Sequence, residues 1–167
     1  MAPLQDECPV RSFEVVKSII ESEYGKSIDN VFATFDETPL GAASIGQVHR
    51  ATLKEDGSNV VVKVMYPGVE DVFRGDVRTI KMFCQLAQPV HVPPLIEIEK
   101  QFMTEFDYRR ESEQLDKVRN NMMKANISGD ASDQMCMIPK PYLDLCTKRV
   151  LVMEELKGNK LVVELKK

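Results

Sequence analysis

The chain has 167 residues, of which 43% are hydrophobic and 29% charged, and its formal net charge is −4 at pH 7. This length suits one domain with a hydrophobic core, and the slight acidity gives no electrostatic reason to expect a nucleic-acid partner. No apolar run approaches the roughly 18 residues that span a bilayer. The first residues, M-A-P-L-Q-D-E-C-P, show neither the basic nor the apolar part of a targeting peptide, so none is expected here.

The cysteines and histidines do not form a recognisable metal site. None of the four cysteines belongs to a C-x-x-C pair, and neither His49 nor His91 lies at ligand spacing from a cysteine. No zinc site is therefore expected, and idle thiols in a reducing compartment are the simpler interpretation. Each of the two isolated histidines is more often structural than a ligand or a base.

A helix and then short strands are predicted for the first 66 residues. Ser12 can cap a helix whose apolar residues fall on one face, and Gly25 is placed to end it. A short apolar segment around Phe32 follows. Strands are predicted at 47–53 and 59–66, joined by the polar turn K-E-D-G-S-N.

Two helices and two further strands are predicted downstream. Apolar residues recur at helical spacing over 69–87, and the proline-rich segment at 89–94 cannot continue that helix. A second, long helix is predicted from about residue 94 to about residue 124. The last strands are expected at 135–138 and 149–154. Five strands with these helices predict an α+β lobe.

Lys63 lies in a strand that is apolar on both faces. In V-V-V-K-V-M, a period of two places Val61, Lys63 and Met65 on one face and three valines on the other. Lys63 is therefore expected to point inward or into a cleft. The alternative, which is the usual one for an isolated lysine in such a strand, is that its stem packs while its amine reaches solvent.

Glu111 occupies a position on the apolar stripe of the long predicted helix. The stripe, at steps of three and four, is Tyr108, Glu111, Leu115, Val118 and Met122. Alternatively, Glu111 lies at the edge of the stripe and is solvated, since its neighbourhood is rich in charges. An inward lysine and an inward glutamate together predict a partly buried ion pair, because either charge buried alone costs about 3–5 kcal/mol. A lysine held in this way can contact phosphate oxygens.

The stretch P-L-G-A-A-S-I-G-Q-V-H-R-A, residues 39–51, has small residues where a nucleotide-binding loop would have them. It matches neither G-x-G-x-x-G nor G-x-x-x-x-G-K-[ST], so by itself it is better interpreted as a tight hairpin. With Lys63, Glu111 and a strand leading into residues 154–158, the order resembles a protein-kinase N-lobe. In that lobe a strand lysine contacts the phosphates of ATP beneath a flexible loop and pairs with a helix glutamate.

Three segments resemble the UbiB or aarF-domain-containing (ABC1) family of atypical kinases. They are P-L-G-A-A-S-I-G-Q-V-H-R-A, V-V-V-K-V-M-Y-P-G-V and E-F-D-Y-R-R-E-S-E, in family order, and R-V-L-V-M-E-E-L-K-G matches the hinge region. The resemblance implies an α+β, kinase-like N-lobe with a five-stranded antiparallel sheet and helices. It divides the chain into a helical extension at 1–34, the N-lobe at 35–154 with a helical insert at 67–125, and a hinge at 155–167 leading to a C-lobe that this chain lacks.

The resemblance also assigns roles to individual residues. Lys63 corresponds to the lysine that contacts the nucleotide, and Glu111 corresponds to its helix partner. Gly41 stands where the family usually has alanine, in the alanine-rich loop. The other loop residues are Ala42, Ala43 and Ser44. The E-x-D motif, thought to face the active site, is Glu105 and Asp107, and the hinge residues beside the adenine are Glu154 and Glu155.

For the whole protein the resemblance implies an ATP-dependent transferase or ATPase that acts in isoprenoid-quinone (ubiquinone) biosynthesis. Its cofactors would be ATP and Mg²⁺, with the Mg²⁺ ligands in the C-lobe and no metal ligand in this chain. Quinone-biosynthesis proteins and a lipid or membrane surface would be its partners, in a mitochondrion or plastid. The family's K-x-G-Q motif is absent. Alone, the chain is expected to bind nucleotide without turning over ATP.

Two other interpretations remain open. The chain could be a non-catalytic module that binds nucleotide or a partner through an exposed face of the lobe. It could also be an unrelated α+β domain in which the loop, the lysine and E-x-D-x-x-x-E coincide by chance, and a large separation between Lys63 and Glu111 would favour that interpretation.

Overall fold

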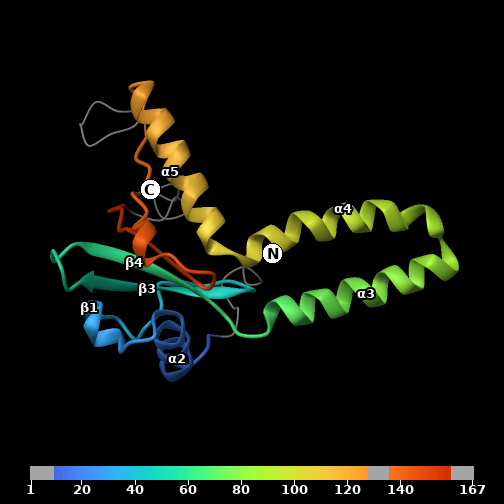
Figure 1. Ribbon diagram of the computed structural model, residues 1–167, viewed down its shortest axis with the longest axis horizontal. Helices are drawn as coiled ribbons and strands as arrows, with labels where there is room; N and C mark the ends of the chain where they lie inside the picture. Colours follow the sequence, from blue (N-terminus) through green and yellow to red (C-terminus); the bar gives the residue numbers. More distant parts are fainter. Residues whose placement is uncertain (1–9, 128–135, 159–167) are drawn as a thin grey trace, which may run out of the picture.

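The computed structural model describes residues 10–127 and 136–158, which form an antiparallel sheet from which a helical hairpin projects (Figure 1). The helices and strands, in chain order, are α2 (Phe13–Tyr24), β1 (Phe32–Phe35), β2 (Gly41–Ala42), β3 (Gly46–Leu53), β4 (Asn59–Met65), α3 (Val69–Ala87), α4 (Val92–Met103), α5 (Tyr108–Lys124) and β5 (Val150–Glu154). The predicted hinge at 155–167 lies mostly outside the described residues.

The sheet has the strand order β1-β3-β4-β5, and β2 pairs with the early part of β3. Every pair is antiparallel. The central strand β4 is rich in valine, whose branched side chain suits a pleated, buried surface. The turn between β3 and β4 contains Gly57 at φ 72°, a left-handed conformation that favours glycine. The predicted α+β fold, a kinase-like lobe with a five-stranded antiparallel sheet, is confirmed.

The two faces of the sheet carry different layers. Helix α2 packs on one face through a buried stripe of Val16, Ile19 and Ile20. That face of β4 presents Val60, Val62 and Val64, all fully buried. On the other face, Met65 and Leu151 pack with Phe106 and Tyr108, which lie just before and at the start of α5. This confirms the prediction that both faces of β4 are apolar and that Lys63 lies on the same face as Met65.

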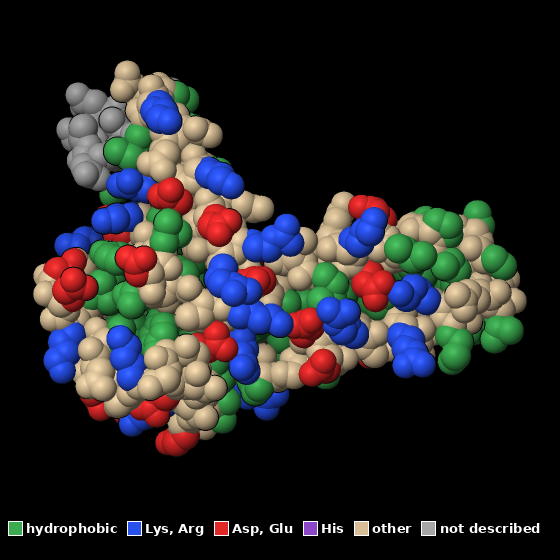
Figure 2. Space-filling view, in the orientation of Figure 1, with side chains coloured by type: hydrophobic (Ala, Val, Ile, Leu, Met, Phe, Trp, Pro, Cys, Tyr) green, Lys and Arg blue, Asp and Glu red, His purple; other side chains and the backbone are tan. Residues whose placement is uncertain are grey.

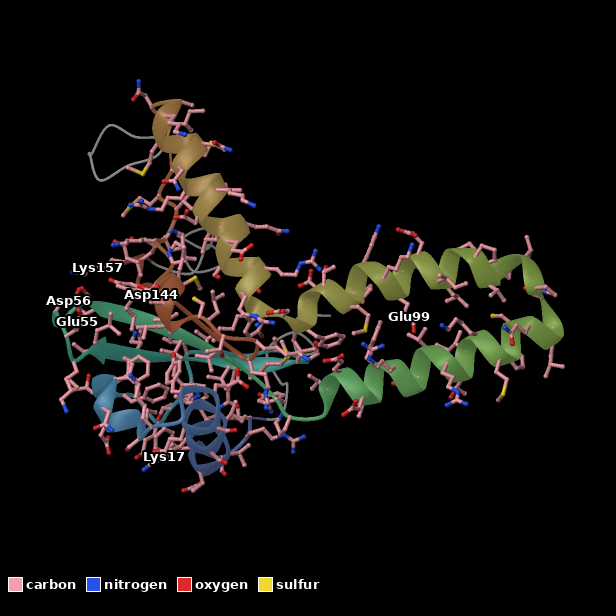
Figure 3. The ribbon with its side chains drawn as sticks, viewed as in Figure 1. Lys17, Glu55, Asp56, Glu99, Asp144 and Lys157 are labelled. Carbon is pink, nitrogen blue, oxygen red and sulfur yellow. The ribbon has the colours of Figure 1, made fainter. Side chains whose placement is uncertain are left out.

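Helices α3 and α4 form a hairpin that extends away from the sheet (Figure 1). Phe73 stacks on Phe102 near the base of the hairpin, with 5.4 Å between ring centroids. Further out, the Lys81 ammonium lies 2.7 Å from the Glu99 carboxylate, and Figure 3 shows Glu99 on the side of α4 that faces α3. Val77 is the buried residue of α3, whereas Val72 and Ile80 of its predicted apolar stripe are exposed. None of the described helices combines the length and apolarity needed to cross a membrane.

The single long helix predicted over 94–124 is wrong, because the chain forms two helices that meet at Asp107. After α4 a short 3-10 turn spans Thr104–Phe106, and Asp107 then adopts an extended conformation with φ −141° and ψ 97°. The Asp107 carboxylate accepts a hydrogen bond from the Arg109 backbone N–H at 3.1 Å and so caps α5. The turn allows both Phe106 and Tyr108 to be buried beneath the sheet, which outweighs continuing the helix.

The strand predicted at 135–138 is also wrong for the part that is described. Residue 135 lies outside the described residues, and no strand forms over 136–138. Beyond it, Pro141 makes one isolated bridge to Met153. Pro139 and Pro141 lack the N–H groups that a continuous ladder requires. The fifth strand is instead the two-residue β2, which lies within the loop of small residues.

Candidate functional site

The predicted ion pair between Lys63 and Glu111 forms. The Lys63 Nζ donates to both carboxylate oxygens of Glu111, each at 2.9 Å. Lys63 lies in the middle of the sheet, between Val48 of β3 and Leu151 of β5. The two side chains are 27% and 41% exposed, so the pair adds about 1 kcal/mol or less to stability. The location of this ion pair therefore says more about a functional site than its small contribution to stability does.

The start of α5 explains why Glu111 reaches Lys63. Asp107 caps the helix, and the Tyr108 backbone N–H donates to the Lys148 carbonyl at 3.1 Å, which ties this end of α5 to the segment before β5. Tyr108 is 1% exposed. Residues three apart lie on the same face of a helix, so burying Tyr108 directs Glu111 toward the sheet as well.

A cavity of about 210 Å³ opens beside the ion pair. Its walls come from the loop of small residues, from β3 and β4, and from the start of α5. The lining residues are Gly41, Ala42, Ala43, Ile45, Gly46, Val48, Lys63 and Tyr108. Among the described residues, Lys63 is the only lining residue with a charged side chain. The fold thus brings the loop predicted to bind phosphate and the predicted lysine to one small, otherwise apolar space.

The loop over this cavity forms a tight hairpin, as one of the two interpretations of residues 39–51 predicts. The Leu40 N–H donates to the Val48 carbonyl and the Ala43 N–H donates to the Gly46 carbonyl, both at 2.7 Å. Gly46 packs against β4 so closely that an added Cβ would lie 2.4 Å from the Val64 carbonyl oxygen. Gly41 has open space around the position of a Cβ, and its φ lies outside the left-handed region.

The remaining loop residue and the E-x-D residues do not line the Lys63 cavity. Ser44 and Glu105 line a separate cavity of about 340 Å³ at the base of the hairpin, together with Phe102 and three other residues. Asp107 is occupied by Arg109, whose guanidinium lies 2.6 Å from its carboxylate. The hydrogen bonds from Arg109 hold the pKa of Asp107 below its usual value. In this fold the Asp107 carboxylate therefore caps α5 and pairs with Arg109.

The two predicted hinge residues also lie apart from the cavity. Glu154 pairs with Val60, three residues along β4 from Lys63, which is a distance of about 10 Å along the strand. Its carboxylate accepts a hydrogen bond from the Lys140 N–H at 3.2 Å. Glu155 forms an ion pair with Arg50 at 2.6 Å. Both carboxylates thus have partners at the end of the sheet.

Tyr108 lines the cavity, although the sequence pattern predicts only that it belongs to an apolar stripe. The Lys63 Nζ lies 4.5 Å from the centroid of its ring. The Tyr108 hydroxyl is buried and has no hydrogen-bond partner among the described residues. Burial raises the pKa of this hydroxyl far above its usual value. Its sequence position could have predicted this location, because an aromatic residue three positions before Glu111 lies on the same face of the helix.

The structural role expected for His49 is also observed. The fully buried His49 ring lies 2.7 Å, through Nδ1, from the Asp36 carbonyl, which can only accept, so Nδ1 carries the proton. The other nitrogen, Nε2, then accepts from the Gln47 amide at 2.9 Å. Tyr66 donates to the Gln47 carbonyl oxygen at 2.9 Å. Burial lowers the pKa of His49, which favours this neutral tautomer.

No cluster of metal ligands joins this site in the part of the chain that the structure describes. Within residues 10–127 and 136–158, no three His, Cys, Asp or Glu side chains come together as a candidate metal centre. Cys84, Cys136 and Cys146 are free thiols. The fourth cysteine, Cys8, lies outside the described residues.

Comparison with known proteins agrees with the resemblance. The sequence model of the ABC1 atypical kinase-like domain matches residues 3–166. The chain is 34% identical over 166 residues to a probable protein kinase UbiB of Pseudomonas paraeruginosa, covering 95% of this chain and 30% of that protein. It is 32% identical over 166 residues to AarF domain-containing protein kinase 1 of Xenopus laevis, covering 96% of this chain and 30% of that protein. The chain therefore spans about 30% of the length of these curated relatives.

Proposed function

The chain belongs to the family of ABC1 atypical kinase-like domains, and on that basis we propose that it is the nucleotide-binding N-lobe of a UbiB-like atypical kinase. ATP would bind in the cavity between the loop at Gly41–Ala43 and Lys63. The observation that carries the proposal is the pair of hydrogen bonds from the Lys63 Nζ to the two carboxylate oxygens of Glu111, at the wall of that cavity. A lysine and a helix glutamate joined in this way are the parts that kinases use to hold nucleotide phosphates.

The lining residues suit the two chemical parts of a nucleotide. The Lys63 ammonium would contact phosphate oxygens, and Glu111 would keep the flexible lysine side chain directed along the cavity wall. Val48 and the alanines of the loop offer apolar surface against which a purine ring could pack. Ser44 and Glu105, in the neighbouring cavity, would lie on the outer side of the loop. Any Mg²⁺ ligands would lie in the C-lobe of the whole protein.

For the whole protein, we propose ATP-dependent phosphoryl chemistry that supports ubiquinone biosynthesis. Support comes from the family membership and from the UbiB relatives. A mitochondrion or plastid would be its location in a eukaryote, and quinone-biosynthesis proteins and a lipid surface would be its partners. Within the whole protein, Glu105 and Asp107 are proposed to face the active site, and the backbone at Glu154 and Glu155 is proposed to contact the adenine.

Titration of the chain with MgATP by isothermal calorimetry tests the nucleotide site. We expect measurable binding by the unmodified chain and at least a tenfold loss of affinity in Lys63→Ala, because this substitution removes the cation that lines the cavity. Glu111→Gln should lose less affinity, since it keeps a polar partner for the ammonium while removing the charge that directs it.

Lys81→Ala is the matched control for this titration. Lys81 also belongs to an ion pair between two elements, at 2.7 Å from Glu99, but it lies on the helical hairpin and lines neither cavity. The affinity of the Lys81→Ala variant for MgATP should equal that of the unmodified chain. Absence of binding at millimolar ATP, or an equal loss of affinity in Lys63→Ala and Lys81→Ala, would contradict the proposed site.

A second candidate function is a non-catalytic module that binds a partner protein. The observation that favours it is the apolar surface at the far end of the hairpin (Figure 2). Met82, Phe83, Leu86 and Val90 are each at least 60% exposed there. Exposed apolar patches of this kind mark interaction surfaces. A chain that stays monomeric and binds no ATP at millimolar concentration would favour this function over the nucleotide site.

A further inference from the structure

We propose that Tyr108 is a positioning residue for Lys63, which acts by holding the lysine ammonium against the face of its ring at the cavity wall. The inference rests on the proposed nucleotide site, because it assigns Tyr108 a role in presenting Lys63 to an anionic ligand. None of the roles implied by the family resemblance falls on this tyrosine. It stands between the residue that caps α5 and the glutamate that pairs with Lys63.

The contact has the geometry of a cation–π interaction. The Lys63 Nζ lies 4.5 Å from the centroid of the Tyr108 ring, within the distance of about 6 Å at which the electron-rich face of the ring attracts a cation. The same nitrogen is 2.9 Å from both carboxylate oxygens of Glu111. Both partners come from the first turn of α5, so placing this helix end sets two contacts to the ammonium at once.

The ring is a fixed support, whereas the lysine and the glutamate are not. Tyr108 is 1% exposed and packs in the cluster of Met65, Phe106 and Leu151. Its backbone N–H is tied to the segment before β5. A side chain whose own rotamer is locked by packing can hold a flexible partner in a productive geometry. Lys63 has four rotatable bonds and is 27% exposed, so it needs such a support.

The ring and the carboxylate hold the lysine in different ways. Glu111 carries a negative charge and is 41% exposed, so an incoming phosphate competes with it for the same ammonium protons. The ring of Tyr108 is neutral and leaves the N–H donors of the ammonium available to oxygen acceptors. Tyr108 can therefore keep its contact with Lys63 when the ammonium turns from Glu111 toward a phosphate.

The hydroxyl of Tyr108 takes no part in this role. It is buried without a hydrogen-bond partner among the described residues, so the ring face is the part of the side chain that meets Lys63. Tyr108→Phe keeps the ring face and is therefore the reference with which the other variants at position 108 are compared. Tyr108→Leu removes the ring face and should weaken binding three- to tenfold.

The decisive experiment weakens the ring face without changing its shape. Phenylalanine with zero, two or four ring fluorines is incorporated at position 108, since fluorine withdraws the electron density that attracts a cation. Each variant is titrated with MgATP, once with Lys63 present and once in a Lys63→Met background. We expect affinity to fall stepwise with fluorination when Lys63 is present, and to stay constant within twofold in Lys63→Met. This series remains informative even if Tyr108→Leu does not fold.

Two outcomes would overturn the role of Tyr108: an affinity that does not respond to fluorination while Lys63 is present, or an equal response in both backgrounds. If the unmodified chain binds no MgATP, the proposed nucleotide function fails instead. The same variants are then compared by thermal unfolding without ligand. A drop in melting temperature with fluorination that disappears in Lys63→Met would still support the contact, and an equal drop in both backgrounds would refute it.

Discussion

Replacing Gly46 by alanine tests how closely the start of β3 approaches β4. A Cβ at this position would lie 2.4 Å from the Val64 carbonyl oxygen and 3.3 Å from the Met65 Cα, both backbone atoms. Ordinary van der Waals contact begins at about 3.4 Å, so β3 and β4 would have to separate locally by about 1 Å. Overpacking of this kind costs about 2–3 kcal/mol. For a chain of this size the melting temperature should fall by roughly 4–12 °C.

Gly41→Ala is the matched control, because Gly41 lies in the same loop and no atom is within 4 Å of its added Cβ. Its φ suits alanine, so stability should stay the same or rise by about 0.4–1 kcal/mol through a less flexible unfolded chain. Both variants are compared with the unmodified chain by thermal unfolding followed by circular dichroism. If Gly46→Ala melted at the same temperature as Gly41→Ala, the close approach of β3 and β4 at Gly46 would be refuted.

Three further predictions concern buried polar groups and the start of α5. Tyr108→Phe should raise stability by about 1 kcal/mol, because it removes a buried hydroxyl that has no partner among the described residues. Tyr24→Phe should lower stability by a similar amount, since the Tyr24 hydroxyl donates to the Leu145 carbonyl at 2.8 Å. Urea unfolding of these two variants and the unmodified chain would show both effects, and a loss of stability in Tyr108→Phe would contradict the first. Burial lowers the pKa of His49, so the unfolded chain binds a proton more readily and stability should fall as the pH drops below 6.5. Urea titrations between pH 5.5 and 7.5 should show this fall in the unmodified chain and in His91→Gln but not in His49→Gln, and an unchanged fall in His49→Gln would contradict it. Asp107→Ala should lose about 1 kcal/mol of stability through the missing cap, whereas Asp107→Asn should lose much less; equal losses in thermal unfolding would rule the cap out.

Much of the fold could be predicted from local pattern. The period of two around Lys63 predicts an inner position on either face of β4, because alternate residues of a strand point to opposite faces; the valine face is fully buried and the Lys63 face is partly buried. Gly25 ends α2 in a left-handed conformation with φ 63°, as its position after an apolar stripe indicates. The strand expected at 135–138 did not form in its described part, since apolar residues there are followed by two prolines that interrupt a ladder.

Some details of the candidate site depended on where the chain turns. The segment E-F-D-Y-R-R-E contains three carboxylates that an uninterrupted helix would place at different angles around its axis. The break at Asp107 makes Asp107 a helix cap and leaves Glu105 at a second cavity, while Glu111 meets Lys63. Sequence spacing cannot predict this break, because it results from burying Phe106 and Tyr108 against a sheet that is distant in sequence.

The sequence by itself determined the α+β class, the inward lysine and its glutamate partner. Those features follow from alternation and helical spacing, which are local properties of the chain. Only the tertiary structure decided that the loop of small residues covers the cavity at Lys63, and that Tyr108 lies beneath the ammonium. These are contacts between segments that lie about 20 to 65 residues apart, and they are set by the pairing of β2, β3 and β4 and by the packing of α5 on the sheet. The sequence sets which residues form the loop, whereas the fold sets which residues the loop faces.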